Sequence, residues 1–470
     1  MTAAVGALVL TAGMVADAGG GRLADGDADR VFHSVSIDTR TMEAGALFIA
    51  LQGERFDGHD FVADAIRQGA AGVLVSRPPA AAGGAAVIVV ADTLRALQDL
   101  ARTVRRRSGA QVVAITGSAG KTTTKEVTAA FLSARYRVFR NQGNLNNHIG
   151  LPLSLLELRH GPDVAVVELG MNHPGEIRTL VGIAEPDVRV WTNVGDAHIG
   201  YFGTRDAVAA AKAEVLEHAS PDARLVANAD DPLVMAHART FAGRVITFGE
   251  RAGADVRATA VVDRGVDGTT CVVDTAAGRL SLTVPLPGRV QLQNVLAAVA
   301  VALEFGVPPP AIETRAAGLT PVHRRGAVTT LPTGARLIDD SYNASPAALR
   351  SMLAALAATR TGGRRIAVLG EMLELGDQAR ALHEECGAMA AAAHVDELVV
   401  VGGPAADGLA AGAVAAGLAA DRVHRFASSA DAAEAVAGLV RGGDLVLIKG
   451  SRGTRMDVVA DRLAQAGASA

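Results

Sequence analysis

The sequence predicts an α/β protein of three domains. Its 470 residues correspond to about three domains at roughly 150 residues each. Short apolar, β-branched runs alternate with helical stretches along most of the chain, the pattern of parallel sheets joined by crossover helices. An apolar content of 49% against 20% charged residues provides ample material for a compact core.

The first domain is expected at residues 1–107. Its strand-like pieces are 35–40, 47–51 and 86–90. The stretch Met1–Ala18 is apolar, but no basic residue precedes Arg22, so we interpret it as an ordinary helix or strand rather than a signal peptide. The basic run 105–109 forms a polar break, which we interpret as a solvated linker.

The central domain is expected at residues 108–320. It opens with a strand at 112–116, a glycine-rich loop and a helix from Lys121. Further apolar runs predict a mostly parallel sheet, with strands at 164–167, 188–192, 225–227 and 245–248. Residues 255–286 alternate Thr, Val and Gly, which predicts a small antiparallel part, and 291–305 returns to a helix.

The third domain is expected at residues 321–470, after the break Gly318–Pro321. Apolar runs alternate there with alanine-rich helical stretches. The strands are expected at 337–338, 366–369, 398–401 and 445–448. This alternation is typical of a doubly wound, Rossmann-like sheet.

Charge and cysteine content argue against several classes of function. A net charge of −4 gives no electrostatic case for binding nucleic acid or an anionic membrane. Cys271 and Cys386 lie far apart in the sequence and predict neither a disulfide framework nor a zinc site. Apolar runs are too short to span a bilayer. We therefore expect a cytoplasmic protein without membrane insertion. A monomer is the expectation, although the sequence does not set the oligomeric state.

A phosphate-binding loop is predicted where the central domain begins. The run Thr116–Thr123 reads Thr-Gly-Ser-Ala-Gly-Lys-Thr-Thr between a strand and a helix. In that setting the backbone N–H groups of residues 118–122 face phosphate oxygens, Lys121 neutralises the β- and γ-phosphates, and the Thr122 hydroxyl reaches Mg²⁺. The spacing Gly-x-x-Gly-Lys-Thr is two residues shorter than the common form. The expected loop residues are Gly117, Ser118, Ala119, Gly120, Lys121, Thr122 and Thr123.

Two polar residues follow further strands of the central sheet. Glu168 ends one apolar run, and His198 lies in the loop after the next one. Ligands of open parallel sheets bind at the carboxyl ends of the strands, so both side chains are expected to face the phosphate loop. A carboxylate and an imidazole suit Mg²⁺ coordination beside a nucleotide. Taken singly, each is more often a structural residue.

Lysine is rare in this chain. Only four of the 45 basic residues are lysine: Lys121, Lys125, Lys212 and Lys449. Arginine always stays charged, whereas a lysine amine can titrate or be modified. If Lys212 adds CO₂, its carbamate is an anion that can hold a metal ion; the alternative is a solvated helix lysine. Lys125 is expected on the surface.

Several motifs together resemble the Mur ligase family. They are the phosphate loop, Gly143–Pro152, Glu168–Ile177, Thr192–His198, Lys212–Glu214, Asp339–Pro346, Leu369–Gly376 and Lys449–Arg452, with 36–40 and 53–59 near the N-terminus. The match covers nearly the whole chain. A sister ligase that adds the third peptide residue often carries Asp-Asn-Pro-Arg, which is absent here. Folylpolyglutamate synthetases share the short loop but lack Asp-Asp-Ser-Tyr-Asn.

The resemblance implies a small UDP-sugar-binding domain, a central P-loop ATPase and a mobile Rossmann-like lid. It implies an ATP-dependent ligase that joins D-alanyl-D-alanine to UDP-N-acetylmuramoyl-tripeptide through an acyl-phosphate. The products would be the pentapeptide precursor of peptidoglycan, ADP and phosphate. The implied cofactors are ATP, one or two Mg²⁺ ions and a carbamylated Lys212.

The resemblance also implies residue roles. Catalysis would use Lys121, Glu168, His198 and Lys212, and the last three would hold Mg²⁺ together with Thr122. The nucleotide would meet Asn294 at adenine, and Arg324 and Asp340 across the interdomain cleft. The substrates would meet Thr39, Arg40, Asn146, Asn147, Arg178, Tyr342, Asn343, Lys449 and Arg452. The chain reads Pro321-Val-His-Arg-Arg325, so the choice between Arg324 and Arg325 stays open.

Two alternatives remain at this point. One is the sister ligase that adds the third residue, and the other is a nucleotide-binding ATPase that joins no substrates. The sequence also leaves open whether the tripeptide ends in diaminopimelate or lysine.

Overall fold

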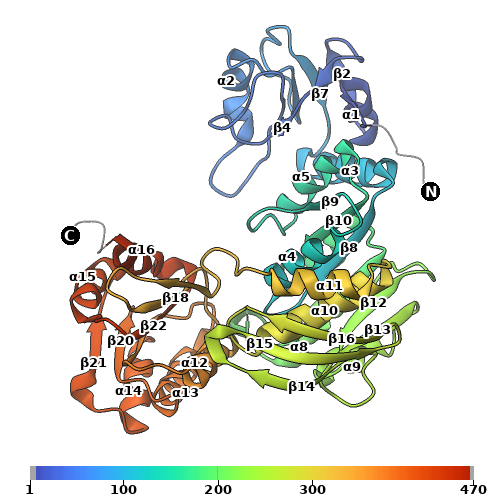
Figure 1. Ribbon diagram of the computed structural model, residues 1–470. Helices are drawn as coiled ribbons and strands as arrows, with labels where there is room; N and C mark the ends of the chain where they lie inside the picture. Colours follow the sequence, from blue (N-terminus) through green and yellow to red (C-terminus); the bar gives the residue numbers. More distant parts are fainter. Residues whose placement is uncertain (1–6, 198, 466–470) are drawn as a thin grey trace. The chain divides into compact units, whose positions relative to one another are not determined.

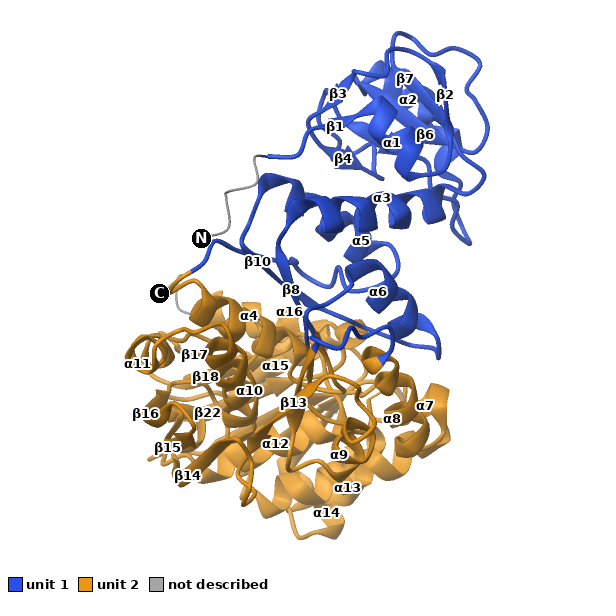
Figure 2. Cartoon of the chain, turned by 90° about the vertical axis from the view of Figure 1, so that its right-hand side faces the viewer, with its two compact units in different colours: residues 1–114, 136–188, 217–223 blue, residues 115–135, 189–216, 224–470 orange. Residues whose placement is uncertain are grey.

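The computed structural model describes residues 7–197 and 199–465 (Figure 1). The chain forms two compact units, coloured in Figure 2. Unit 1 comprises residues 1–114, 136–188 and 217–223, and unit 2 comprises 115–135, 189–216 and 224–470. Within the described ranges, no helix is long and apolar enough to cross a membrane.

A five-stranded sheet organises the first part of unit 1. Its order is β2-β7-β6-β5-β4, with β2 antiparallel to β7 and the remaining pairs parallel. Phe48 and Val73 pack with Val62 of a covering helix in one buried cluster. The elements are α1 (Ala12–Ala18), β2 (Arg22–Asp25), β4 (Val35–Ser36), β5 (Leu47–Ile49), α2 (Val62–Arg67), β6 (Gly72–Val75), β7 (Ala86–Val89) and α3 (Thr93–Ser108), and β1 (Leu10–Thr11) pairs separately with β3 (Val31–Phe32).

Two expectations for this region were wrong in part. The strand expected at 35–40 ends at Ser36, because the Ser36 hydroxyl and the Asp38 carboxylate accept the backbone N–H groups of Asp38 and Arg40 and close a turn. The linker expected at 105–109 is the end of helix α3, which Gly109 terminates at φ +68°. Arg105 is not solvated there, since its guanidinium binds Ala184 O and Asp187.

The remainder of unit 1 contains parallel strands β9 (Val138–Arg140) and β10 (Val164–Glu168). Helices α5 (Gly150–Leu156) and α6 (Glu176–Ala184) pack against each other and against α3. Strand β8 (Gln111–Thr116) passes from unit 1 into unit 2 after Ala114. The strand at 164–167 was predicted, whereas β9 was not.

The first half of unit 2 carries the phosphate-loop helix and a run of sheet strands. The parallel register extends from β12 through β14, and β14, β15 and β16 are antiparallel, which confirms the expected antiparallel part. The elements are α4 (Lys121–Leu132), β11 (Val188–Trp191), α7 (Ile199–Phe202), α8 (Arg205–Ala213), β12 (Arg224–Asn228), α9 (Pro232–Ala238), β13 (Arg244–Gly249), β14 (Val256–Asp263), β15 (Thr269–Thr275), β16 (Gly278–Val284), α10 (Val290–Glu304) and α11 (Pro309–Ala317).

The second half of unit 2 is a three-layer α/β structure (Figure 1). Its sheet has the order β17-β18-β22-β19-β20-β21, parallel except for β17. Alternate strand residues face two buried clusters: one with α12, α13 and α14, the other with α15 and α16. The elements are β17 (Ala327–Thr330), β18 (Arg336–Asp340), α12 (Pro346–Ala358), β19 (Arg365–Gly370), α13 (Ala379–Ala392), β20 (Glu397–Val401), α14 (Asp407–Ala415), β21 (Val423–Phe426), α15 (Ser429–Leu439), β22 (Leu445–Lys449) and α16 (Asp457–Gln465).

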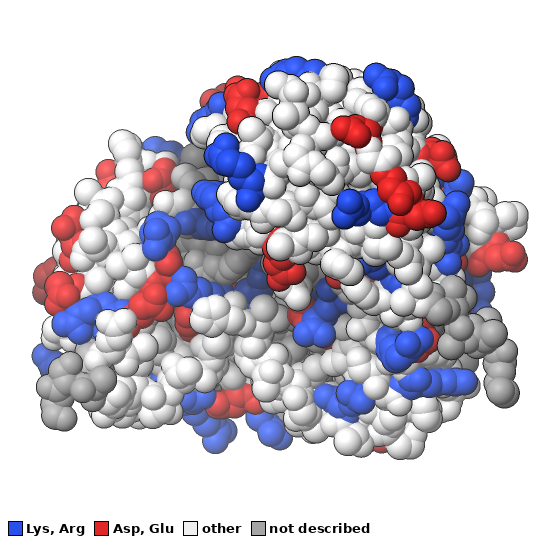
Figure 3. All heavy atoms as spheres, turned by 90° about the horizontal axis from the view of Figure 1, so that it is seen from above, with Lys and Arg blue, Asp and Glu red and all other residues white. Residues whose placement is uncertain are grey.

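Positive and negative side chains alternate on the protein surface. On the face drawn in Figure 3, basic and acidic groups are interspersed among neutral ones. Ion pairs among the described residues include Arg106 with Glu185 at 2.7 Å and Arg462 with Glu434 at 2.7 Å. Exposed pairs of this kind contribute little to stability, about 0–1 kcal/mol each.

Candidate nucleotide site

The glycine-rich loop connects β8 to α4 with two glycines in the left-handed region. Gly117 has φ +152° and Gly120 has φ +81°. A Cβ atom on Gly117 would lie 1.9 Å from the Thr192 Oγ1 atom, and one on Gly120 would lie 2.1 Å from Asn294 Oδ1. Both positions therefore require glycine for their backbone conformation and for the close approach of a neighbouring side chain.

Asn193 holds the phosphate loop from the neighbouring strand end. The Ser118 N–H donates to its carbonyl oxygen at 3.1 Å, and the Ala119 N–H donates to its Oδ1 at 2.9 Å. These two N–H groups were expected to face phosphate, but here Asn193 occupies them. Asn193 was not among the predicted site residues, although its place directly after a predicted strand in Thr-Asn-Val-Gly-Asp was a usable signal.

Lys121, Thr122 and Thr123 form the first turn of α4. The Lys121 ammonium donates to the carbonyl oxygen of Gly117 at 2.8 Å and is half-buried. Thr122 is 9% exposed. A helix N-terminus that carries a lysine and lies beside a glycine loop attracts phosphate oxygens, because the N–H dipoles and the ammonium are both positive.

A cavity of about 650 Å³ opens beside the phosphate loop. One side is formed by Ser118–Lys121 and Thr123, with 193–197 and the start of α10. The other side is formed by Asp340, 342–345, 373–375 and 449–453. All of these residues belong to unit 2. The volume lies within the range of small-molecule sites, about 300–1,000 Å³.

Asp340 and Lys449 end neighbouring parallel strands on the far side of this cavity. The Lys449 ammonium donates to Asp340 Oδ2 at 2.5 Å and to the carbonyl oxygen of Asn343 at 3.0 Å. Burial raises the pKa of the Asp340 carboxyl, and the Lys449 charge opposes that rise. Lys449, which was predicted to bind substrate, is 3% exposed and already holds the 340–343 segment.

The two adjacent arginines after α11 point to different places. Arg324 forms ion pairs with Asp457 and Asp461 of α16, at 2.9 and 2.8 Å. Arg325 lines the cavity, and its guanidinium carbon lies 4.1 Å from the centroid of the Tyr342 ring. The structure therefore places Arg325, rather than the predicted Arg324, beside the cavity. Arg452 also lines the cavity, 5.8 Å from the same ring centroid.

Asn294 lies beneath the phosphate loop. Its Oδ1 accepts the Thr124 hydroxyl at 3.2 Å, and its Nδ2 donates to Gln291 at 2.9 Å. The side chain is 4% exposed and also lines the cavity. It thus supports the loop directly, while the predicted adenine contact stays a prediction.

Two lysines of α4 and α8 are buried. Lys212 is 1% exposed, and its pKa lies well below the usual value because burial and the nearby positive charge of Lys121 both disfavour the ammonium. Lys125 is also 1% exposed, with an ion pair to Glu126 at 3.3 Å. The expectation of a surface position for Lys125 was wrong, because its side chain is buried in α4, a helix that packs against α10 and α11.

The predicted residues of unit 1 are placed within that unit. Glu168 ends β10 at 3% exposed, and its Oε1 accepts Asn146 Nδ2 at 2.5 Å. Asn147 caps the start of α5 with its side-chain oxygen. Exposed Arg178 pairs with Glu217 at 2.5 Å. Thr39 and Arg40 lie in a turn, where Arg40 pairs with Asp38 at 2.6 Å.

The predicted metal site is not described as a whole. His198 lies outside the described residues. Within 7–197 and 199–465, no cluster of three or more His, Cys, Asp and Glu side chains is arranged to hold a metal ion. The predicted ligand set also needs an imidazole and a modified lysine, besides a carboxylate and a hydroxyl. It therefore stays a prediction.

The fold and this site define a class of protein. A strand, a glycine loop and a helix beside a polar cavity of this size are the features of a P-loop α/β protein with a nucleotide-sized site. Three family descriptions match consecutive parts of the chain: the Mur ligase family catalytic domain at 31–105, the Mur ligase middle domain at 115–302, and the Mur ligase glutamate ligase domain at 324–452. The chain belongs to the Mur ligase family.

Individual relatives cover most of the chain. The UDP-N-acetylmuramoyl-tripeptide–D-alanyl-D-alanine ligase of Bacillus subtilis is 35% identical over 91% of this chain and 92% of its own length. The ligase of the same name from Escherichia coli is 38% identical over 80% and 82%. A crystal structure of MurF from Acinetobacter baumannii has a TM-score of 0.88 at 33% identity, covering 97% of this chain and 99% of its own. MurF from Thermotoga maritima, solved in complex with ADP, has a TM-score of 0.82 at 30% identity, covering 93% and 98%.

Proposed function

We propose that this chain is an ATP-dependent ligase that joins D-alanyl-D-alanine to UDP-N-acetylmuramoyl-tripeptide. The observation that carries the proposal is a cavity lined by the phosphate loop on one side and by Asp340, 342–345, Lys449 and 451–453 on the other. The glycine loop and Lys121 suit the phosphates of a nucleotide, and the polar residues of the opposite wall suit a second substrate. The names of the relatives supply the identity of the substrates.

The proposed reaction activates a carboxylate with ATP. The terminal carboxylate of the tripeptide attacks the γ-phosphorus, the bond to the β-phosphate oxygen breaks, and ADP leaves. The amine of the dipeptide then attacks the acyl carbon, an amide bond forms, and phosphate leaves with loss of one proton from nitrogen. Lys121 spreads the negative charge that develops on the transferred phosphoryl group. An acyl-phosphate hydrolyses in water, so the site must exclude water while it exists.

We assign the nucleotide contact near the linker to Arg325. It lines the cavity and stacks on Tyr342, whereas Arg324 is engaged by α16. A guanidinium there would bind phosphate oxygens through paired N–H donors. Arg452 is the cation that we assign to the carboxylate of the dipeptide. Lys449 holds the 340–343 segment in place.

Lys212 is proposed to carry a carbamate. Its buried amine has a lowered pKa, which favours the neutral form that attacks CO₂. The nitrogen–carbon bond forms and one proton leaves, which gives an N-carboxylate. That anion suits the position better than an ammonium, because the positive charge of Lys121 acts on it.

The donor chemistry fits Mg²⁺. The Thr122 hydroxyl, the Glu168 carboxylate and a Lys212 carbamate would supply hard oxygen ligands, which Mg²⁺ prefers, and His198 would complete the set. When bound, Mg²⁺ would neutralise phosphate charge.

We further propose that the protein acts in the cytoplasm as a monomer. The two buried cysteines, Cys271 and Cys386, are both free, in line with a reducing compartment.

A phosphate-release assay tests the function. The chain is mixed with ATP, Mg²⁺ and UDP-N-acetylmuramoyl-tripeptide, with and without D-alanyl-D-alanine, and the product is weighed by mass spectrometry. Sustained phosphate release should need both substrates and should yield the pentapeptide. Phosphate release at the same rate with and without the peptide substrates would instead indicate an ATPase that joins no substrates. A second assay replaces D-alanyl-D-alanine with diaminopimelate or lysine and uses a UDP-linked acceptor that still lacks its third residue. Turnover in that assay would indicate the sister ligase.

A further inference from the structure

Arg324 joins the segment after α11 to the last described helix. Its Nη1 lies 2.9 Å from Asp457 Oδ2, and its Nη2 lies 2.8 Å from Asp461 Oδ2 and 3.0 Å from Asp461 Oδ1. Asp457 begins α16, and Asp461 lies one turn later on the same face. Two carboxylates from one helix therefore fix both ends of a single guanidinium.

The backbone at Arg324 has an unusual conformation. Its φ is +58°, in the left-handed region, and Gly326 follows with φ +79°. The Arg324 carbonyl oxygen accepts the Tyr342 N–H at 3.1 Å, and the Gly326 N–H donates to Asp339 O at 2.9 Å. A non-glycine residue in this region is strained and persists where its surroundings hold it. The side-chain ion pairs to α16 are such a restraint.

Arg325 lies between these two fixed points. Its guanidinium meets the face of Tyr342, and across the described residues no ion pair holds it. The Arg325 charge also acts on the Asp340 carboxyl and opposes the rise of its pKa. These two attractions can hold the guanidinium only where the backbone of the 324–326 turn directs the side chain toward them.

We propose that Arg324 is a positioning residue for the nucleotide site. Its double ion pair with α16 fixes the 324–326 turn, and this turn directs Arg325 along Tyr342 toward the cavity. The inference rests on the proposed function, because it takes the cavity as the nucleotide site. Arg324 itself touches no substrate and acts through Arg325.

A double-mutant cycle on the full-length chain tests the coupling. The Kd for ADP is measured by calorimetry for wild type, Arg324→Gln, Arg325→Gln and the double variant, and the KM for ATP and kcat are measured in parallel. Arg325→Gln should weaken ADP binding about tenfold and Arg324→Gln about threefold to tenfold. The double variant should bind ADP as Arg325→Gln does, because the loss of positioning has no further effect once Arg325 is gone. KM for ATP should rise more than kcat falls.

Two further variants separate positioning from general stability. Arg455→Gln removes an ion pair with the same Asp457 and should leave ADP binding unchanged. Asp461→Asn removes half of the Arg324 clamp at a side chain that is 52% exposed, and it should weaken ADP binding in the same direction as Arg324→Gln even if the arginine variant folds poorly.

The outcomes distinguish this inference from the proposed function. If Arg324→Gln and Asp461→Asn bind ADP as wild type does, or if the effects of Arg324→Gln and Arg325→Gln add fully, the positioning role is wrong while the ligase assignment stands. If wild type binds no ADP and releases no phosphate, the proposed function and this inference both fail.

Discussion

The Nζ atom of Lys449 lies 2.5 Å from Oδ2 of Asp340, at the carboxyl ends of two neighbouring parallel strands. The side chains are 3% and 14% exposed. Burial raises the pKa of the Asp340 carboxyl, and the positive charges of Lys449 and Arg325 oppose that rise. The pair therefore ties the cavity wall at 340–343 to the end of β22.

Lys449→Met should destabilise the protein strongly. The change leaves a buried carboxylate without its partner, which costs about 3–5 kcal/mol when a buried pair is broken. Adding Asp340→Asn should restore part of that loss, since the uncompensated charge is then gone. Urea denaturation measures both. If the single and double variants unfold at the same midpoint, the pair is not coupled as the geometry indicates.

Gly120→Ala should impair nucleotide binding. An added Cβ would meet Asn294 Oδ1 at 2.1 Å, so either the loop or Asn294 must move. Gly253→Ala is the matched control, because Gly253 has φ +89° but no atom within 4 Å of its Cβ position. Both variants should lose about 1 kcal/mol of stability from the left-handed backbone. Only Gly120→Ala should also raise the Kd for ADP, and a similar rise in both would rule out the steric explanation.

Lys212→Arg should be inactive although arginine is also a long basic side chain. Arginine cannot form the carbamate, whereas the lysine amine of lowered pKa can. Because carbamate formation needs the neutral amine, activity should fall as the pH drops through that lowered pKa and should recover with added bicarbonate. Labelling with ¹³C-bicarbonate should give a carbamate signal in wild type that Lys212→Arg lacks. Full activity in the arginine variant would exclude the carbamate.

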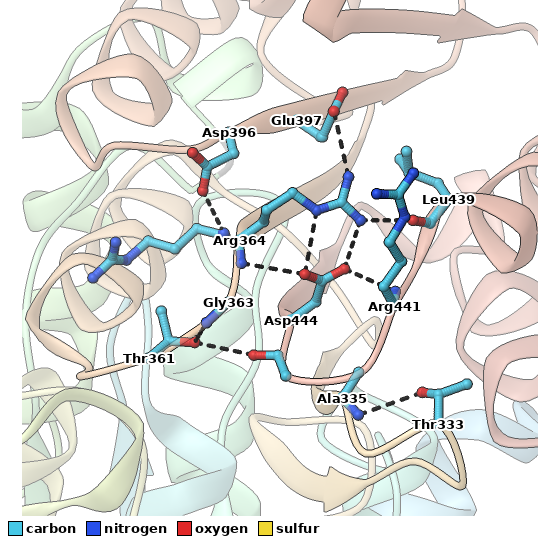
Figure 4. Close-up of polar contacts among 12 residues, drawn as sticks. Thr333, Ala335, Thr361, Gly363, Arg364, Asp396, Glu397, Leu439, Arg441 and Asp444 are labelled. Carbon is cyan, nitrogen blue, oxygen red and sulfur yellow. Dashed lines mark hydrogen bonds and ion pairs between the residues drawn. The ribbon is translucent and has the colours of Figure 1, made fainter.

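A cluster of charged side chains lies at the amino ends of β19, β20 and β22, and it predicts acid sensitivity (Figure 4). Arg364 binds Asp444 at 2.7 Å and lies 3.5 Å from Glu397, which also accepts His424 and Arg422. Burial alone would raise the pKa of both carboxyls, but their hydrogen bonds lower each pKa below its usual value of 3.8 for Asp444 and 4.5 for Glu397. A lowered folded-state pKa stabilises the protein above the unfolded-state value and loses that contribution as the pH falls.

Asp444→Asn should therefore lose about 3 kcal/mol at neutral pH, and its deficit should shrink as the pH falls below about 4. Glu434→Gln, which breaks the exposed pair with Arg462, is the control and should change stability by less than about 1 kcal/mol throughout. Urea titrations between neutral pH and pH 3 measure the difference. A deficit of Asp444→Asn that stays constant with pH would contradict the assignment of the effect to its charge.

The sequence predicted those parts of the fold that local patterns encode. Buried parallel strands such as 398–401 read as unbroken apolar runs, and the structure has them as β20. Strand β17 escaped notice because Ala327–Thr330 is short, partly exposed and paired at the sheet edge. This segment is a strand because it pairs with β18, and no local sequence pattern indicates that pairing.

The candidate site was predicted less completely, for a related reason. The glycine loop and Lys121 follow from a contiguous motif, and they lie beside the cavity. The choice between Arg324 and Arg325 depends on one left-handed backbone angle and on a helix more than 130 residues away. Lys125 is buried in α4, a helix that packs against α10 and α11, which come much later in the sequence. Such contacts join segments distant in the sequence, so residue type alone could not reveal them.

The burial of the lysines leaves few reactive side-chain amines on the surface of this protein. Lys125, Lys212 and Lys449 are at most 3% exposed, and Lys121 is half-buried at the cavity. Among the lysine and arginine side chains of the described residues, the fully exposed ones are thus arginines, which do not react with amine-directed esters under mild conditions. Such a reagent, which modifies most proteins indiscriminately, should here acylate Lys121 before any other side chain. Bound ADP should protect it, so that lysine acylation becomes a direct readout of occupancy at the cavity.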